Sequence, residues 1–114
     1  MSNRIETYDE FYLYYLREHR KPLTRLLHYI AAFASLSVAL YALIFGPLIA
    51  LLLVPVAGYG PAWIGHFFIE KNRPATFQYP GWSLISDYVM TWHWLTGRLS
   101  GWRRRAGVAP SDQR

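Results

Sequence analysis

The chain has 114 residues, of which 53% are hydrophobic, 18% aromatic and only 17% charged, and its formal net charge is +5. This length fits one compact domain, and so low a charged fraction is unusual for a soluble domain. There is no cysteine, which excludes disulfides, thiolate catalysis and cysteine-ligated metal, so any metal site has to use His, Asp, Glu or water.

The excess of Lys and Arg lies beside apolar segments instead of on a polar scaffold. A basic patch on a soluble scaffold would indicate nucleic-acid binding. Basic residues at the ends of apolar segments are typical of contacts with anionic lipid head groups. We therefore expect membrane lipids as partners and no nucleic acid.

The first predicted element is an amphipathic helix over residues 1–21. One apolar and aromatic stripe recurs at spacings of three and four: Ile5, Tyr8, Tyr12, Tyr15 and His19. Such a helix lies in the membrane interface or against other helices. Lys21-Pro22 ends it, because the residue before a proline avoids the helical region.

Two membrane spans follow. No Asp, Glu, Lys or Arg occurs between Arg25 and Glu70, and Gly46-Pro47 interrupts this run near its middle. Each half has about the 20 residues needed to cross a hydrocarbon core. We predict spans over residues 26–45 and 48–70, which the short turn makes antiparallel neighbours. The alternative is a core hairpin of a soluble protein, but the run offers no polar face for water.

The charges at the ends of the spans predict their orientation. The turn at Gly46-Pro47 carries no charge. The opposite ends of the spans are flanked by six basic residues: Arg17, Arg20, Lys21, Arg25, Lys71 and Arg73. By the positive-inside rule, both termini face the cytoplasm. The sequence leaves the oligomeric state open, a homo-oligomer included.

A fourth helix is predicted over residues 82–99, after a loop punctuated by Pro74, Pro80 and Gly81. It is too aromatic to be fully exposed, and whether it spans the membrane or lies flat stays open. The tail over residues 100–114 is basic and then polar, and we expect it to be frayed. The predicted fold is all-α: a single membrane-embedded, multi-span helical bundle with an amphipathic N-terminal helix, an antiparallel transmembrane hairpin and a C-terminal aromatic helix.

Three histidines are expected at one depth of this bundle. His28 lies 18 residues before Gly46, and His66 lies 19 residues after Pro47, so an antiparallel hairpin places both at nearly the same level. The break before the first span and the stripe that ends in His19 turn this residue toward them. We predict a metal site of His19, His28 and His66 near the cytoplasmic face. Ordinary interfacial histidines are the alternative.

Two carboxylates are candidates for catalytic roles. Glu70 follows His66 by four residues, so both lie on one helix face. Glu70 is a candidate metal ligand or an acceptor that orients a histidine ring; pairing with Lys71 or Arg73 at the surface is the alternative. Asp87 is the only carboxylate of the aromatic fourth helix. It is expected to make a buried hydrogen bond, or else to lie in the head-group layer.

Two further features of the sequence have ordinary structural explanations. His93 is flanked by Trp92 and Trp94, which is typical of an aromatic belt at the membrane interface, so it is left outside the site. Pro61 and nearby glycines predict a bend in the second span. Broken helices in membranes line cavities, although a tolerated kink in a packing seam is the alternative.

Two sequence blocks resemble a known family. They are YLREHRKPLTRLLHYIAAF and GYGPAWIGHFFIEKNRPATFQYPGWSLISDY. Together they closely resemble the family once catalogued as domain of unknown function 962, or Mpo-like, whose fungal members are 2-hydroxy fatty acid dioxygenases of the endoplasmic reticulum. The resemblance extends from about Tyr8 to Arg98, and the chain is similar to the short bacterial members of the family.

The resemblance implies an iron(II)-dependent integral membrane enzyme, here of the bacterial inner membrane, that uses dioxygen to shorten a 2-hydroxy fatty acid by one carbon in fatty acid α-oxidation. The characteristic histidines of the family fall on His19, His28 and His66. Its acidic position falls on Glu70, and its Asn-Arg-Pro motif begins at Asn72.

The residues suit that chemistry. Neutral imidazoles bind Fe(II), and three of them leave coordination positions for substrate and dioxygen. Arg25 or Arg73 is expected to pair with the substrate carboxylate, together with Asn72, although either arginine could instead hold lipid phosphate.

Three competing functions stay open on the sequence. His28 and His66 are candidate axial ligands of a haem. A histidine-ligated zinc would direct the site toward hydrolysis. A non-enzymatic helical scaffold or transporter subunit would hold no metal at all.

Overall fold

A computed structural model describes residues 4–108 of the chain, and all of its regular elements in that range are helical. In chain order these elements are α1 (Tyr8–Arg17), α2 (Pro22–Phe45), η1 (Leu48–Leu53), α3 (Val54–Ile64), η2 (Gly65–Glu70), η3 (Ala75–Phe77), α4 (Pro80–Leu95) and α5 (Leu99–Arg105). The all-α prediction is confirmed.

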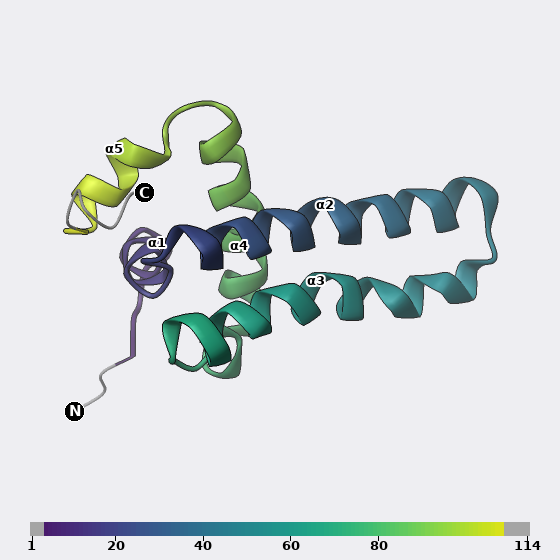
Figure 1. Ribbon diagram of the computed structural model, residues 1–114, viewed down its shortest axis with the longest axis horizontal. Helices are drawn as coiled ribbons and strands as arrows, with labels where there is room; N and C mark the ends of the chain where they lie inside the picture. Colours follow the sequence, from purple (N-terminus) through teal and green to yellow (C-terminus); the bar gives the residue numbers. More distant parts are fainter. Residues whose placement is uncertain (1–3, 109–114) are drawn as a thin grey trace.

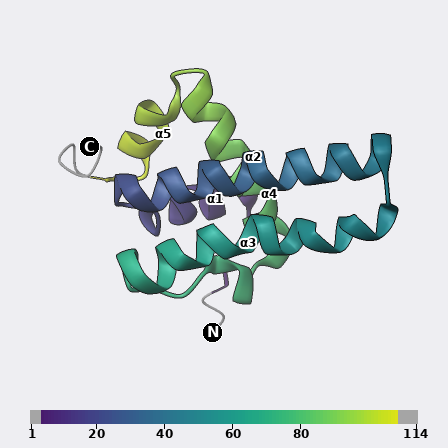
Figure 2. The ribbon, with the colours of Figure 1, turned by 45° about the vertical axis from the view of Figure 1, so that its right-hand side comes forward.

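The longest feature is a hairpin of two antiparallel helical arms (Figures 1 and 2). The first arm is α2, and the second runs without a gap through η1, α3 and the π-helix η2. Gly46 joins them at a φ of 71°, a value that side-chain-bearing residues rarely adopt. Small residues let the arms approach: a Cβ added to Gly58 would lie 3.6 Å from the Ser35 Cβ.

Both arms are long and apolar enough to cross a membrane, by length and composition. Most of their apolar side chains face outward, including Phe45 at 73% exposure and Leu52 at 72%. In the most apolar window of each arm, only 33% of the first and 11% of the second is buried. Contiguous exposed apolar surface of this kind marks a site of contact with lipid or with another protein.

The core lies at the end of the hairpin away from the turn. There α1, α4 and α5 gather around a cluster of aromatic and aliphatic side chains that includes Phe11, Tyr12, Tyr15, Leu16 and Met90. In Figure 1, α4 crosses the hairpin while α1 lies against its open end. This cluster fixes α1 and α4 beside the first turns of α2.

The N-terminal helix is shorter than residues 1–21. Thr7 caps it by accepting a hydrogen bond from the Glu10 backbone N–H at 3.2 Å, and the helix ends at Arg17. Pro22 then begins α2, because its ring fixes φ and a missing N–H is harmless in a first turn. Residues 18–21 therefore form a link between α1 and α2. The orientation of the His19 side chain is consequently not set by the axis of either helix. Residues 1–3 lie outside the described range.

The predicted fourth helix over 82–99 is divided in two. α4 begins at Pro80 and ends at Leu95, and Gly97, at a φ of 73°, lets the Arg98 N–H donate to the carbonyl of His93 at 2.8 Å. This is the usual way in which a glycine ends a helix.

The expectation of a frayed tail is wrong for residues 100–108. Leu99–Arg105 form α5, and Arg103, Ala106 and Val108 are buried against the rest of the protein. Apolar side chains interspersed among the arginines provide the surface that docks this helix. Residues 109–114 lie outside the described range.

Candidate metal centre

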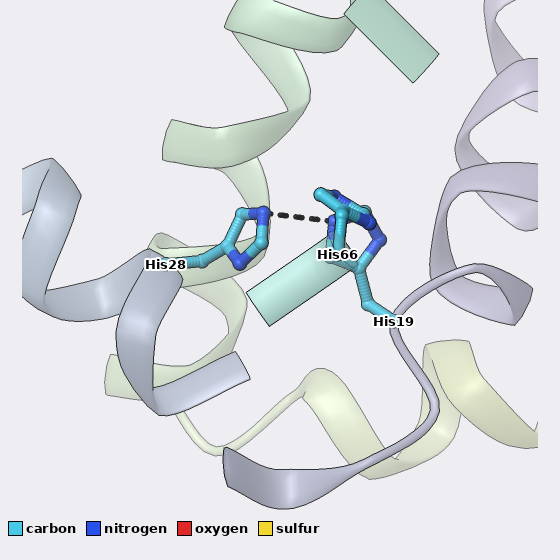
Figure 3. Close-up of side chains that lie close together, drawn as sticks. All are labelled: His19, His28 and His66. Carbon is cyan, nitrogen blue, oxygen red and sulfur yellow. Dashed lines mark hydrogen bonds between the residues drawn. The ribbon is translucent and has the colours of Figure 1, made fainter. Parts of the chain in front are cut away.

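His19, His28 and His66 come together at the open end of the hairpin (Figure 3). Their side chains are almost completely buried, with exposures of 1%, 2% and 3%. The ring centroids are separated by 4.3 Å (His19–His28), 4.4 Å (His19–His66) and 4.9 Å (His28–His66). Each ring comes from a different segment: the link after α1, the second turn of α2, and η2.

Close approach of the two arms positions two of these rings. A Cβ added to Gly65 would lie 3.0 Å from Thr24 Cγ2 and 3.4 Å from Thr24 Cα. Thr24 is fully buried, so a side chain at position 65 would have to displace a packed neighbour at this crossing. Gly65 of η2 and Thr24 of α2 therefore meet at the crossing, one residue before His66 and four residues before His28.

The Nδ1 atom of each histidine is held by an oxygen acceptor. His19 Nδ1 donates to the Tyr15 carbonyl at 2.6 Å, and His28 Nδ1 donates to the Thr24 carbonyl at 2.8 Å. His66 Nδ1 lies 2.7 Å from Asn72 Oδ1. Because carbonyl oxygens only accept hydrogen bonds, the proton is on Nδ1 of His19 and His28. Their Nε2 atoms then carry lone pairs.

Those lone pairs face each other. The Nε2 atoms of His19 and His28 lie 3.0 Å apart, and one ligand atom from each of the three histidines can be chosen so that all lie within 4.8 Å of one another. Two lone pairs at this distance repel unless a proton or a metal ion lies between them. Two nitrogens that bind one divalent ion at ~2.1 Å lie ~3 Å apart when they meet it at a right angle. The donor set therefore fits a metal ion.

Protonation is a poor alternative to a metal here. Burial, with smaller contributions from His28 and His66, lowers the pKa of His19 well below its ordinary value. A buried neutral imidazole is the form that binds metal.

A haem does not fit between His28 and His66. A bis-histidine haem needs its flat macrocycle between the two axial nitrogens. The ring of His19 lies 4.3 Å and 4.4 Å from those of His28 and His66, so it occupies the space that a porphyrin would need.

Asn72 and Glu70 support the centre from its outer side. Asn72 accepts from His66 and donates its Nδ2 hydrogen to the Glu18 carbonyl at 3.0 Å, which ties the π-helix arm to the link that carries His19. Glu70 Oε2 accepts from the Lys21 backbone N–H at 2.6 Å. Glu70 therefore lies against the start of α2. Within residues 4–108, it does not belong to the group of side chains close enough together to hold one metal ion.

The two arginines proposed as substrate contacts have different surroundings. Arg25 is 5% exposed, and its Nη1 donates to the carbonyls of His19 at 2.9 Å and Arg20 at 2.6 Å. It thus fixes the backbone of the link. Arg73 is exposed on the loop after η2, with its guanidinium 5.1 Å from the ring centroid of Phe77.

Asp87 reaches the centre through Tyr15. The Tyr15 hydroxyl donates to Asp87 Oδ1 at 2.5 Å, and the Tyr15 ring stacks on His19 with centroids 3.9 Å apart. Burial raises the pKa of Asp87 from 3.8 to about 7, and the hydrogen bond from Tyr15 partly opposes this shift.

Sequence reasoning missed Tyr15 and Thr24 as ring-orienting residues. Both precede a site histidine by four residues, the spacing at which a helical carbonyl faces the side chain.

Small cavities lie between the histidines and α4. One of about 10 Å³ is lined by His28, His66, Trp63 and Asp87 among others, and a neighbouring one of about 30 Å³ by His28, Tyr59 and Asp87. Each is large enough for about one water-sized molecule. Trp63 Nε1 is buried at this place and has no hydrogen-bond partner within residues 4–108. Sequence reasoning did not single out Trp63.

His93 lies apart from the triad, as expected. Its Nδ1 is 2.7 Å from the Tyr12 hydroxyl, and its ring stacks on Trp102 with centroids 5.2 Å apart. The neighbouring Trp92 and Trp94 are exposed. His93 thus belongs to the aromatic packing between α1, α4 and α5.

The chain matches a known protein family. The family model described as 2-hydroxy-palmitic acid dioxygenase Mpo1-like matches residues 5–99, a range that contains all three histidines and their supporting residues. Searches of curated proteins and of solved structures found no match. The matched region covers most of the chain, and the chain therefore belongs to the Mpo1-like family.

Proposed function

We propose that the protein is a membrane-embedded, iron(II)-dependent dioxygenase that shortens 2-hydroxy fatty acids by one carbon. The observation that carries this proposal is the buried group of three histidines, whose ligand atoms lie within 4.8 Å of one another. The family description, which names a 2-hydroxy-palmitic acid dioxygenase, supplies the reaction class.

The membrane location is supported by the surface of the hairpin. Both arms have outward-facing apolar side chains along their length, and the second arm is buried least. Basic residues gather at the open end, whereas the turn at Gly46-Pro47 has no charge. The positive-inside rule then puts both termini and the histidines on the cytoplasmic side.

The overall reaction balances with one molecule of dioxygen. Breaking the bond between the carboxyl carbon and the hydroxyl-bearing carbon gives an acid one carbon shorter, carbon dioxide and water. Bound Fe(II) would supply the redox chemistry with dioxygen and a positive charge that holds the 2-hydroxy carboxylate.

The protein itself supplies a rigid set of neutral ligands. Tyr15, Thr24 and Asn72 hold the three Nδ1 atoms, so every Nε2 is directed inward without a conformational cost on metal binding. Arg25 holds the link that carries His19 at the carbonyls of His19 and Arg20, and Glu70 holds it at the Lys21 N–H. We assign these residues a positioning role.

Trp63 and Asp87 are the proposed contacts for the polar end of the substrate. The indole N–H of Trp63 can donate to a carboxylate or hydroxyl oxygen, because residues 4–108 give it no hydrogen-bond partner and it lines the same cavity as His28 and His66. Asp87 lines that cavity from the opposite helix and can accept the hydrogen of the 2-hydroxyl group. The exposed Arg73 is a first contact for an incoming carboxylate.

The cavities hold about one water-sized molecule each, so a long acyl chain cannot lie inside them. The chain of the substrate is therefore expected to leave the site along the apolar outer surface of the hairpin. This arrangement keeps the polar end at the metal and the apolar end in lipid.

The test is iron content and turnover of the detergent-purified protein, reconstituted anaerobically with Fe(II). Stoichiometric iron that is lost in His28→Ala and His66→Ala, together with dioxygen-dependent conversion of 2-hydroxy-palmitic acid to an acid one carbon shorter, is the expected result. His93→Ala is the matched control and should retain both.

Two other outcomes would each contradict a part of the proposal. Stoichiometric zinc with no iron binding would keep the metal centre but redirect the chemistry to hydrolysis. Well-folded protein that binds no metal would contradict the enzyme proposal and leave a non-enzymatic membrane scaffold.

A further inference from the structure

A cavity of about 650 Å³ lies at the start of α2, on the side that does not contain the three histidines. Its lining includes Pro22, Leu26 and Tyr29 of α2, Trp94 of α4 and two arginines, Arg25 and Arg103. The volume is in the range of sites that hold small organic ligands. The cavity is open at one side, so a ligand does not have to be fully enclosed.

The two arginines give this cavity its charge. Arg25 is 5% exposed and Arg103 is 2% exposed. Arg25 Nη1 and Arg103 Nη2 both donate to the carbonyl of Arg20, at 2.6 Å and 3.2 Å, so the two guanidinium groups lie side by side. Within residues 4–108, the side chains that line the cavity include no carboxylate. The two guanidinium groups therefore favour an anionic ligand in this cavity.

The wall of the cavity changes from charged to apolar in one direction. Leu23 and Leu26 are about half exposed and lie on the outer surface of α2, which continues through Ile30 along the first arm. Tyr29 and Trp94 stack in parallel with centroids 4.4 Å apart and close the opposite side. A ligand with an anionic head and an apolar chain would match both halves.

We propose that this cavity binds the head group of an acidic phospholipid from the leaflet at the open end of the hairpin. Two adjacent guanidinium groups can donate to the non-ester oxygens of one phosphate. The open side next to Leu23 and Leu26 lets the acyl chains stay in the bilayer. The inference needs the membrane location proposed above, but it needs neither a metal nor an enzymatic activity.

The lipid has a structural consequence for the metal centre. Arg25 also donates to the carbonyl of His19, so a phosphate bound to Arg25 and Arg103 braces the link that carries a metal ligand. The link is otherwise held by Asn72 and Glu70 from the other side.

The test compares two neighbouring arginines of α5. The detergent-purified protein is titrated with phosphatidylglycerol or phosphatidylcholine, and binding is measured by native mass spectrometry and by the thermal unfolding midpoint. Arg103→Gln removes the buried guanidinium, whereas Arg104→Gln removes the same charge from an exposed position. We expect saturable binding of phosphatidylglycerol to the wild type and to Arg104→Gln, and affinity at least about tenfold lower in Arg103→Gln.

Three results would overturn the proposal. Equal losses in the two variants would mean general attraction to a basic surface. Equal binding of phosphatidylcholine would mean that the cavity does not distinguish an anionic head group from a zwitterionic one. Palmitate that competes more strongly than phosphatidylglycerol, and is lost in Arg103→Gln, would mean that the cavity takes a fatty carboxylate.

A second pair of variants covers the case in which Arg103→Gln does not fold. Ser100 lines the cavity and is exposed, so Ser100→Glu adds a negative charge there without altering the core. Thr96→Glu adds the same charge at an exposed position that does not line the cavity. Phosphatidylglycerol binding should weaken about tenfold in Ser100→Glu and remain in Thr96→Glu. Unchanged affinity in Ser100→Glu would contradict the proposal.

Discussion

The Nε2 atoms of His19 and His28 lie 3.0 Å apart, although the Nδ1 atom of each ring already donates to a backbone carbonyl. Neither ring can offer the other a hydrogen without becoming a buried cation. A metal ion removes this repulsion, so binding should favour the folded protein strongly.

Metal removal should therefore lower stability. A metal at 100 times its Kd stabilises the folded state by ~2.7 kcal/mol, and a chelator should reverse this in the wild type. We expect the chelator to lower the thermal unfolding midpoint of the wild type and of His93→Gln, but not that of His66→Gln. A chelator-independent midpoint in metal-loaded wild-type protein would contradict a metal centre.

Asn72 should control metal affinity without being a ligand. Its Oδ1 holds Nδ1 of His66, and its Nδ2 holds the link at Glu18. Loss of such a supporting hydrogen bond weakens metal binding by roughly 10–100-fold. We expect this loss in Asn72→Ala, measured by competition with a chromophoric chelator. Asn72→Asp still accepts from Nδ1 and should lose less; equal losses would assign the effect to the Glu18 contact.

A side chain at position 65 should destabilise the crossing of the two arms. A Cβ would lie 3.0 Å from Thr24 Cγ2, and fully buried Thr24 cannot move away easily. We expect Gly65→Ala to destabilise the protein by ~1–3 kcal/mol and to weaken metal binding. Gly60→Ala is the control: nothing lies within 4 Å of its Cβ, so it should be neutral or stabilise the helix by up to ~1 kcal/mol. Similar stability of the two variants would contradict the close crossing.

Asp87 should make stability depend on pH. Burial raises its folded-state pKa from 3.8 to about 7, so the folded protein binds the proton more tightly than the unfolded chain. The resulting stabilisation is complete below pH ~4 and is lost as the pH rises through ~7. Asp87→Asn still accepts from Tyr15 and cannot ionise. We expect the difference in unfolding midpoint between metal-free Asp87→Asn and wild type to grow from pH 5 to pH 8. A constant difference would mean that Asp87 is ionised throughout.

Trp63 should affect substrate binding more than metal binding. If its buried N–H donates to a charged substrate oxygen, Trp63→Phe removes a hydrogen bond worth ~1.5–3 kcal/mol, or roughly 10–100-fold in KM. Iron content should not change. Trp92→Phe, at an exposed position of α4, should leave both quantities unaltered. Loss of iron in Trp63→Phe would instead indicate a packing role beside His66.

The sequence by itself determined the all-helical fold and the two apolar arms. These follow from local properties: a charge-free run, the Gly46-Pro47 break and a stripe at helical spacing. The common depth of His28 and His66 also followed from counting, because a tight antiparallel turn fixes the register of its arms.

Only the tertiary structure decided how the centre is supported. Asn72, Arg25 and Glu70 were expected at the metal or the substrate, yet their polar atoms hold His66 and the backbone of the link. Spacing along the chain predicts which face of a helix a side chain lies on. It does not predict which backbone group of another segment that side chain contacts. For the same reason, the sequence did not predict α5. Its docking brings Arg103 beside Arg25, and a contact between residues so far apart depends on packing that no local pattern records.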